Sequence, residues 1–407
     1  MLKIVRIDKF ILIGFMGSKM NSKTVSRRRV DSVSLIRIMD KGAGSLLCHM
    51  LGILGKKREI PKEIKKIALI KFFGFGNVIM ISPFFKLLKQ IFPNAKLILL
   101  TLTGNKKLAS FYKTIDKVID INLSNPVLIP SKILNAIDKL RNEDIDVIID
   151  FEQYSRTSAI ISFLSNARFG VGFSLDKNPR CLLYDKTIEC NENEHMIKQF
   201  HKLVSIITTK RNEDIELEKI EYTNNDIKFV DNLINGVMRK IVVLHVGNGP
   251  NAPEKRWPTE RFVELAKRLD DRKLRIAIIG SDQDKKEVEI FKSKFNSEYI
   301  DVYNRLTIPQ LAYFLTKANV FVSADTGPAH LAASVDVPSV VLYGPSTPTI
   351  YGSWGKNVHH LYTNLWCSPC GTNKNSHEYI CINRIYQKCM LDISVNKVEK
   401  MVLEIMK

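Results

Sequence analysis

Short, wholly apolar segments alternate with segments whose apolar residues recur every three or four positions, first from residue 65 to about 150 and again from residue 241. Apolar runs of four or five residues predict buried strands, and apolar residues at every third or fourth position predict amphipathic helices. The expected strands are 67–70, 96–102, 118–121, 147–149, 241–245, 276–279, 320–322 and 340–343, and the expected helices are 79–91, 259–269, 284–295 and 309–316. Such alternation is typical of parallel sheets covered by helices on both faces.

A polar stretch at 215–239 separates the two alternating regions. We therefore expect an α/β protein with two Rossmann-like domains, 61–235 and 236–407, that face a central cleft. Ligands of such sheets bind beyond the carboxyl ends of the strands.

Residues 1–60 are expected to form a separate, basic extension. Residues 1–66 hold sixteen Lys and Arg against five Asp and Glu, a large part of the formal charge of +19. The cluster Arg27–Arg29 precedes a stretch, 35–54, in which apolar residues recur at helical spacing, although Gly42 and Gly44 interrupt it. Two interpretations stay open: a helix lying in an anionic membrane surface, or a helix packed on the protein body.

Composition excludes several classes of protein. Seven cysteines, three of them far from the others, do not form the framework of a secreted disulfide-rich domain. No apolar run approaches the roughly 18 residues that span a bilayer, and the start of the chain lacks a convincing signal-peptide cleavage site. We therefore expect a catalytic body in the cytoplasm. The basic charge suits an anionic partner, but no nucleic-acid module or interleaved aromatic pattern accompanies it, so nucleic acid is not expected as a partner.

The first candidate ligand-binding turn is Gly74–Asn77, directly after an expected strand and before an expected helix. Glycines allow the backbone to approach a ligand, and a helix N-terminus favours negative charge. The turn lacks the full G-x-G-x-x-G spacing and no acidic residue ends the next strand, which argues against a dehydrogenase. An ordinary tight turn would also explain it.

The second candidate turn follows the expected strand 241–245 and contains His245, Gly247 and Asn248. Lys255 and Arg256 come just ahead of the next helix. Backbone amides together with a cation form a cradle for pyrophosphate. Trp257 is expected to pack and close this loop rather than to stack on a base.

The third candidate turn contains Asp325, Thr326 and Gly327, again between a strand and a helix, with His330 one turn into that helix. Asp325 and Thr326 could cap the helix, which explains them without a ligand. His330 would be able to reach a phosphate or a sugar hydroxyl. Two phosphate-compatible turns in the same half favour the ligand-binding interpretation.

Four cysteines gather near the end of the sequence, at Cys367, Cys370, Cys381 and Cys389. A C-x-x-C pair with two later cysteines could hold zinc or act in redox chemistry. The later spacing is not that of a zinc ribbon, so plain thiols that shape a loop are preferred and no metal is expected.

The ordered set of motifs resembles glycosyltransferase family 9, the ADP-heptose:lipopolysaccharide heptosyltransferases, over roughly residues 64–400. The matching blocks are Ser82-Pro83, Pro93–Lys96, Asp150, His245/Gly247, Lys255–Pro258, Asp325–His330, Tyr343–Ser346 and Cys367–Cys370. The resemblance implies a GT-B fold in which the first domain binds the acceptor and the second binds ADP-heptose. It also implies that the last helix, 395–406, crosses back to the first domain, and that the sugar is transferred with inversion without a cofactor or an obligatory metal.

The resemblance also implies roles for the residues of the second half. Lys255 would neutralise the diphosphate leaving group, and Thr326, Gly327 and His330 would bind phosphate or ribose. Asp325 would position the sugar or order the loop.

One position departs from the family pattern. Family members usually carry an aspartate after the first glycine turn, as the general base for the acceptor hydroxyl, and this chain has Asn77. A carboxamide cannot accept that proton. Asp150 and Glu152, at the end of a neighbouring strand, are the candidates to replace it. Alternatively, positioning and leaving-group stabilisation suffice, or the protein is a silent relative.

The resulting hypothesis is an inverting glycosyltransferase that moves heptose, or a related sugar, to a lipopolysaccharide core or similar glycolipid. We expect it to be peripheral to the inner membrane, with its basic extension on the anionic surface. The alternative is a catalytically weak or inactive relative that binds a sugar nucleotide within a glycan-assembly complex.

Overall fold

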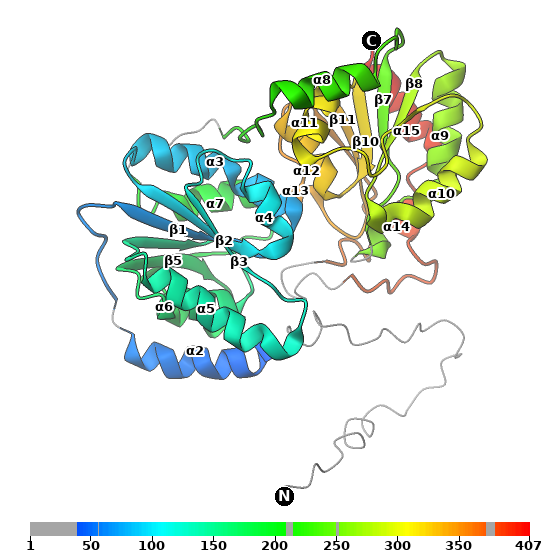
Figure 1. Cartoon of the computed structure of the whole chain (residues 1–407). Helices are drawn as coiled ribbons and strands as arrows, with labels where there is room; N and C mark the ends of the chain where they lie inside the picture. The colour runs from blue at the N-terminus through cyan, green and yellow to red at the C-terminus, as the bar shows by residue number, and fades with distance from the viewer. Residues whose placement is uncertain (1–38, 56, 209–214, 250–251, 372–378) are drawn as a thin grey trace, which may run out of the picture.

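A computed structural model describes residues 39–55, 57–208, 215–249, 252–371 and 379–407, and the basic cluster Arg27–Arg29 lies outside these residues. Two six-stranded sheets, each flanked by helices, form two halves that stand side by side (Figure 1). The α/β class and the two Rossmann-like halves predicted from the sequence are confirmed. In the part of the chain that the structure describes, no helix is both long enough and apolar enough to cross a bilayer.

The first half is built on a sheet of order β3-β2-β1-β4-β5-β6, in which all neighbouring strands are parallel. Its strands are β1 (Lys66–Ile70), β2 (Lys96–Leu102), β3 (Lys117–Ile121), β4 (Val147–Asp150), β5 (Phe169–Ser174) and β6 (Lys186–Glu189). Its helices are α3 (Phe75–Ile91), α4 (Thr103–Ala109), α5 (Ile129–Arg141), α6 (Arg156–Leu164) and α7 (Met196–Val204), with short 3-10 helices η1 (Pro126–Leu128) and η2 (Pro179–Leu183).

The second half has a sheet of order β12-β11-β10-β7-β8-β9, also parallel. Its strands are β7 (Ile241–His245), β8 (Arg275–Ile279), β9 (Ile300–Asp301), β10 (Val320–Ala324), β11 (Ser339–Tyr343) and β12 (Val358–Tyr362). Its helices are α8 (Asn224–Leu233), α9 (Thr259–Asp271), α10 (Lys285–Lys294), α11 (Ile308–Thr316), α12 (Gly327–Ser334), α13 (Pro348–Tyr351), α14 (Lys388–Leu391) and α15 (Val395–Ile405).

Both sheets have the same topology when their strands are counted along the chain. In each half the chain reverses direction across the sheet between its first and fourth strands, which are β1 and β4 in one half and β7 and β10 in the other. A crevice opens beyond the carboxyl ends of the strands at such a point. The loops after these four strands are therefore where a ligand site is expected.

The chain enters the second half earlier than residue 235. Helix α8 packs against α11, so residues from Asn224 onward already belong to the second half. The segment before α8 is extended, and its Leu217 joins a core cluster with residues of α3. The sequence pattern missed this change because α8 is polar along most of its surface, with Val230 as its buried residue.

The last helix does not cross back to the first half as expected. Helix α15 packs against α9 and β11. Its apolar face, Val395, Val398 and Val402, is buried in the same cluster as Val242 of β7 and Leu342 of β11. Since this face is fully used within the second half, the expectation of a crossing helix was wrong.

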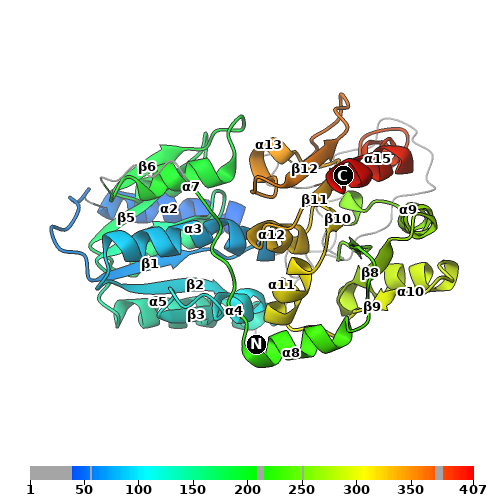
Figure 2. The ribbon, with the colours of Figure 1, turned by 90° about the horizontal axis from the view of Figure 1, so that it is seen from above.

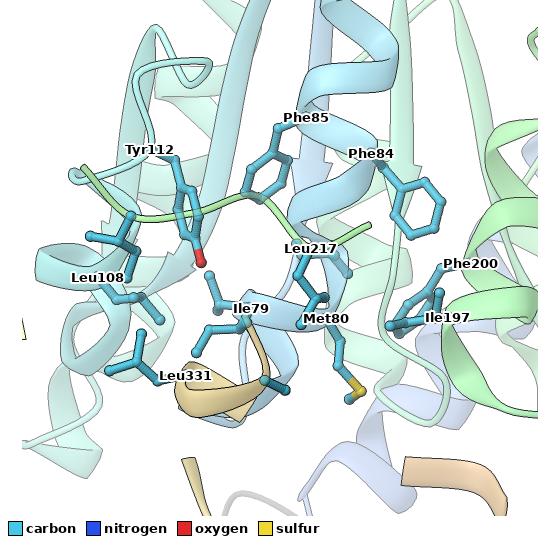
Figure 3. Packing of buried hydrophobic residues seen from close by; sticks show 14 of the residues in the cluster. Ile79, Met80, Phe84, Phe85, Leu108, Tyr112, Ile197, Phe200, Leu217 and Leu331 are labelled. Atoms are coloured by element: carbon cyan, nitrogen blue, oxygen red, sulfur yellow. The ribbon is translucent and has the colours of Figure 1, made fainter. Parts of the chain in front are cut away.

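The two halves share one hydrophobic core. Helix α12 of the second half packs against α3 of the first, and the two lie side by side between the sheets (Figure 2). Figure 3 shows Leu331 of α12 in one cluster with Ile79 of α3 and Leu108 of α4. All three side chains are fully buried. Burying a leucine of this kind contributes roughly 1.5–3 kcal/mol, so this contact fixes how the halves face each other.

Helix α2 (Ala43–Leu54) makes up most of the described part of the expected basic extension. It begins after Gly42 and packs against α6 and η2, as a helix on the outer face of the first half (Figure 1). Two of the cations that follow it, Lys57 and Arg58, make contacts within the protein. Lys57 donates to the backbone oxygen of Tyr184, and Arg58 forms an ion pair with Asp185 at 2.9 Å.

A second contact between the halves involves His195, the N-cap of α7. Its Nδ1 accepts from the backbone N–H of Ile197 at 3.2 Å, so Nε2 carries the proton and donates to the backbone oxygen of Gly352 at 2.8 Å. Its ring also lies 4.8 Å from that of Trp354, measured between centroids. The bond that Nδ1 accepts requires a neutral imidazole, and burial lowers the pKa of His195 to about 4.

This histidine predicts a pH dependence of stability. Its pKa is about 4 when folded and about 6.5 when unfolded, so between these values the unfolded state binds more protons and the free energy of unfolding falls as pH falls. We expect His195 to contribute a loss of about 2 kcal/mol between pH 7.5 and pH 5. Urea unfolding at both pH values checks this. The variant His195→Asn keeps a side-chain acceptor at the N-cap but does not titrate. Its free energy of unfolding should therefore fall by about 2 kcal/mol less than that of the wild type between the two pH values. Equal falls in the variant and the wild type would show that His195 is not the group responsible.

Candidate functional site

A cavity of about 830 Å³ lies between the halves and is lined by both of them. Its walls include the loops after β1 and β4 of the first half, and the loops before α9 and after β10 of the second. Small-molecule sites usually measure roughly 300–1,000 Å³, so this cavity can hold a ligand of substantial size. Its position agrees with the crevice that the two sheet topologies predict.

The first glycine turn forms one edge of the cavity. Gly74 is the N-cap of α3. Its φ of +87° is a conformation that glycine adopts without strain. Gly76 lies against the second half: an added Cβ would be 2.3 Å from Cδ2 of His330. The turn therefore brings the N-terminus of α3 to the second half, which a larger residue at 76 would prevent.

Asn77 lines the cavity, as the sequence predicted for this position. Its side-chain Nδ2 donates to the backbone oxygen of Phe73 at 3.0 Å. The side chain thus holds the turn together. With the carboxamide so oriented, it offers no group that accepts a proton in acid–base chemistry.

Asp150 is the last residue of β4, and its side chain is not part of the cavity wall. Its side chain is fully buried and pairs with Arg180 at 2.8 Å, and it also accepts from the Tyr184 hydroxyl and from the backbone N–H of Glu152. A carboxylate held in this way orders the loop after β4. The geometry therefore favours a structural role for Asp150 over the tentative catalytic one.

Glu152, two residues further along, lines the cavity. Its Oε1 accepts from Lys71 Nζ at 2.9 Å and from the backbone N–H groups of Phe72 and Phe73 at 2.7 and 3.2 Å. Because the described bonds converge on Oε1, the carboxylate is fixed in one orientation while it joins the loops after β1 and β4. Among the two carboxylates considered from the sequence, this is the one that the structure brings to the cavity.

On the opposite wall, Lys255 forms an ion pair with Asp325 at 2.6 Å. Asp325 also accepts from the Ser346 hydroxyl at 2.6 Å, and the Lys255 ammonium lies 4.9 Å from the centre of the Tyr379 ring. Burial alone would lower the pKa of Lys255, but Asp325 and Tyr379 raise it well above its usual value. The lysine therefore carries a fixed positive charge at the cavity wall.

The third turn leads into α12, whose N-cap is Thr326. The Thr326 side chain makes no capping bond; its hydroxyl pairs with Ser323 at 2.9 Å and with His245 Nδ1 at 3.2 Å. The alternative explanation of Thr326 as a helix cap without a ligand is therefore not supported. Thr326 and Gly327 line the cavity, so the N-terminus of α12 meets the cavity without a side-chain cap.

His245, Gly247 and Asn248 lie behind that wall rather than on it, since the cavity lining does not include them. His245 Nε2 lies 3.6 Å from Asp284, whose Oδ1 accepts from the backbone N–H of Gly249 at 2.9 Å. A Cβ at Gly247 would lie 2.0 Å from Asp284, which explains the glycine. These residues support the loop and orient Thr326.

His330 lines the cavity from the first turn of α12, where it is almost fully buried. Burial lowers the pKa of His330 to about 4, so the imidazole is neutral near pH 7. Its Nδ1 has no hydrogen-bond partner among the described residues. A buried, unpaired ring nitrogen at a cavity wall is a group that a ligand hydroxyl or phosphate can satisfy.

Two residues around Lys255 hold the loop in place. Trp257 is buried, and its Nε1 donates to the backbone oxygen of Ile393 at 2.9 Å, so its predicted packing role is confirmed. Arg256 donates to the Gly249 backbone oxygen at 2.9 Å and pairs with Glu287 at 2.8 Å. The guanidinium therefore points into the loop and is not among the groups that line the cavity.

Three tyrosines on the cavity wall were not foreseen from the sequence. They are Tyr154 after β4, Tyr351 at the end of α13 and Tyr379 near the C-terminus. Tyr154 and Tyr351 are in mutual hydrogen-bond contact across the two halves. Isolated tyrosines outside any motif carry no sequence signal of their own, and only the fold brings them together.

The four late cysteines come close to one another in the second half, since Cys367, Cys370 and Cys381 each help to raise the pKa of Cys389. Burial raises the pKa of Cys389 to about 11. All four are free thiols. Among the described residues, no group of three or more His, Cys, Asp and Glu side chains is arranged to hold a metal ion.

Comparisons with known proteins agree with this architecture. The family model of glycosyltransferase family 9 (heptosyltransferase) matches residues 133–380. The lipopolysaccharide heptosyltransferase 1 of Escherichia coli strain K12 is 23% identical over 310 residues, covering 72% of this chain and 92% of that protein.

Two solved structures share the fold. The E. coli ADP-heptose lps heptosyltransferase II aligns with a TM-score of 0.67 at 18% identity, covering 84% of this chain and 98% of the other. The E. coli heptosyltransferase WaaC with ADP aligns with a TM-score of 0.63 at 21% identity, covering 84% and 99%. The two-domain GT-B architecture is thereby established, and with a family model that matches most of the chain, the protein belongs to glycosyltransferase family 9 and is a glycosyltransferase.

Proposed function

We propose that the protein transfers a heptose from ADP-heptose, or a closely related nucleotide sugar, to a hydroxyl of a lipopolysaccharide core or similar glycolipid, with inversion at the anomeric carbon. Relatives named as lipopolysaccharide heptosyltransferases support the sugar and the acceptor class. The observation that carries the proposal is the partly buried, charged Lys255 beside the N-terminus of α12, which has no side-chain cap, at one wall of a cavity.

In this proposal, the second half binds the nucleotide sugar. A helix N-terminus and a lysine together suit a diphosphate, because both offer N–H donors and positive potential. The backbone of Thr326 and Gly327 would meet the phosphates, with Lys255 as their counter-charge and His330 offering its neutral ring to a phosphate or a ribose hydroxyl. The solved relative described as bound to ADP supports this ligand class.

The reaction is a single displacement. The acceptor hydroxyl oxygen attacks the anomeric carbon from the face opposite the diphosphate, and the bond between that carbon and the diphosphate oxygen breaks. The nucleoside diphosphate leaves with the electron pair of that bond, and the acceptor proton passes to a base on the enzyme. Lys255 stabilises the charge that develops on the leaving group, a contribution that is usually large in enzymes.

Glu152 is the proposed base. It is the carboxylate of the loop after β4 that lines the cavity, whereas Asp150 is buried below it and Asn77 cannot accept a proton in this way. The ion pair with Lys71 and the two backbone N–H groups hold the Glu152 carboxylate in one orientation. A base held by a buried lysine compensates for the departure from the family pattern at position 77.

The first half would bind the acceptor and lie on the anionic inner face of the inner membrane. Helix α2 supports this, because Leu46, Met50, Ile53 and Leu54 are each more than half exposed. An apolar face on the outside of a helix suits the interface of a bilayer. The net charge of +19 adds attraction to anionic lipid.

The alternative function, a relative that binds a sugar nucleotide without transferring the sugar, has one observation in its favour. Asn77 replaces the residue expected as the base and is committed to a backbone hydrogen bond. In that case ADP-heptose would bind, but no acceptor would be glycosylated.

Replacing Lys255 tests the sugar-donor site. Lys255→Gln removes the charge but leaves a side chain that donates hydrogen bonds to Asp325. We expect kcat/KM for transfer from ADP-heptose to fall about 100-fold or more, since one preorganised group for the leaving oxygen is lost. The Kd for ADP should rise about tenfold. Turnover on a deacylated core oligosaccharide and calorimetric titration with ADP measure both.

The matched control is Lys292→Gln. Lys292 also pairs with an aspartate of the second half, Asp301, but lies away from the cavity lining. The Lys292→Gln substitution should leave kcat/KM and the Kd for ADP unchanged. ADP affinity and turnover that are the same in Lys255→Gln as in the wild type would refute the assigned donor site.

Replacing Glu152 tests the base. Glu152→Gln keeps the size and the contact with Lys71 but cannot take the proton, so kcat should fall about 100-fold with little change in the KM for the nucleotide sugar. Adding Asn77→Asp to this variant places a carboxylate at the first turn of α3 and should raise its kcat at least tenfold. Full activity of Glu152→Gln would eliminate Glu152 as the base. No transfer by the wild type or by Asn77→Asp, with ADP-heptose bound, would favour the alternative function.

A further inference from the structure

Helix α2 packs on the protein with its small residues and turns its large apolar residues outward. Gly44 and Cys48 are buried, and an added Cβ at Gly44 or Gly52 would lie 3.2 Å from Arg156 or 2.9 Å from Leu182. These three positions recur every fourth residue, so they form one face of the helix. Leu51 packs beside this face against the body, whereas Leu46, Leu47 and Leu54 stay 63%, 44% and 75% exposed.

One of these leucines belongs to the cavity. Leu47, on the flank of α2, lines it together with Ile133 and Leu134 of α5 and with Ile160 and Leu164 of α6. We call this part of the cavity the α2–α5 arm. Leu47 and Leu134 are 44% and 59% exposed, so the arm has an apolar wall that is open to solvent.

The lining changes from apolar to polar along one short segment. From Glu152 to Arg156, each residue of the loop after β4 lines the same cavity. At its end, Asp40 accepts from the backbone N–H groups of Arg156 and Thr157 at 3.1 and 2.7 Å and so ties the start of α2 to the start of α6. The arm and the proposed base are therefore two ends of one continuous cavity.

We propose that the α2–α5 arm binds a hydrocarbon chain of a lipid-linked acceptor while the sugar part of the same molecule lies at Glu152. The inference rests on the proposed function, and it assigns a lipid subsite to residues of α2, which precede the part of the chain that the family model matches.

The continuity of the cavity favours this occupant. An exposed apolar groove is costly in water, so covering the half-exposed Leu47 and Leu134 favours an apolar occupant. A ligand that reaches both the apolar arm and the polar centre must itself be amphiphilic. A second protein chain on the outer face of α2 would cover Ile53 and Leu54 but would give no reason for the arm to open onto the reaction centre.

Binding of a fluorescent fatty acid, dansylundecanoate, to the full chain tests the arm without any need for catalysis. Leu134→Gln and Leu47→Gln should each raise its Kd about tenfold, because each places a polar group on the wall. Val127→Gln is the control, since Val127 is 85% exposed next to the arm but does not line the cavity. Failure of the probe to bind, or an equal loss of affinity in Val127→Gln, would overturn the proposal.

Removing residues 1–38 gives a further comparison. Unchanged probe affinity in that truncated chain supports an arm that takes an external lipid. A large gain in affinity would overturn the proposal, because it would mean that the chain's own N-terminal segment occupies the arm.

Kinetics then separate this inference from the proposed function. With an acylated acceptor in detergent, Leu134→Gln should raise the KM for the acceptor about tenfold and leave kcat unchanged, while the KM for the deacylated acceptor stays at the wild-type value. Equal effects on both acceptors would contradict a hydrocarbon subsite. If the probe binds at the arm but neither acceptor is glycosylated, the proposed function fails and the lipid site stands.

Discussion

A close contact between the first turns of α3 and α12 determines where the two halves of the protein meet. Gly76 leaves room for the His330 ring, and Gly327 leaves room for Phe75, since an added Cβ would lie 2.3 Å and 2.9 Å from those side chains. Leu331 then enters the core that the first half has built around α3. Because both helices meet here by their N-termini, two sets of helix dipoles point at one cavity, and the site favours an anionic ligand even before any lysine is counted.

The charged groups around this contact are each held by an ion pair. Lys255 is kept charged by Asp325, which is itself held by Ser346, and Glu152 is kept in place by Lys71. One wall thus carries a cation beside a helix N-terminus, and the opposite wall carries a carboxylate. Displacement of a diphosphate by a hydroxyl needs these two groups on the two sides of the reacting carbon. Removing either partner of such a buried pair leaves an uncompensated charge, so the pairs serve the fold as well as the chemistry.

The sequence predicted the sheets, and it predicted that the residues around Lys255 and Asp325 lie together, because buried parallel strands and glycine turns leave a strong local pattern. The limits of β7 agree with the prediction, and Lys255, Asp325, Thr326, Gly327 and His330 do gather at the cavity. Supporting contacts left no such pattern. Tertiary packing determines three features that the sequence did not predict. His245 lies behind the wall, Asp150 is buried with Arg180, and α15 stays within its own half. The outward leucines of α2 were visible as an apolar periodicity, but only the structure shows that glycines and a cysteine make the inner face.

The central claim is that the contact between α3 and α12 assembles one reaction site from two halves, and Gly76→Ala tests it most directly. The backbone at Gly76 suits alanine, so the added methyl group acts through its clash with His330. Gly104→Ala is the control, because nothing lies within 4 Å of a Cβ at that position. We predict that kcat/KM for transfer from ADP-heptose falls at least tenfold in Gly76→Ala, with an unchanged circular dichroism spectrum, and is unchanged in Gly104→Ala. Wild-type kinetics in Gly76→Ala would contradict the account.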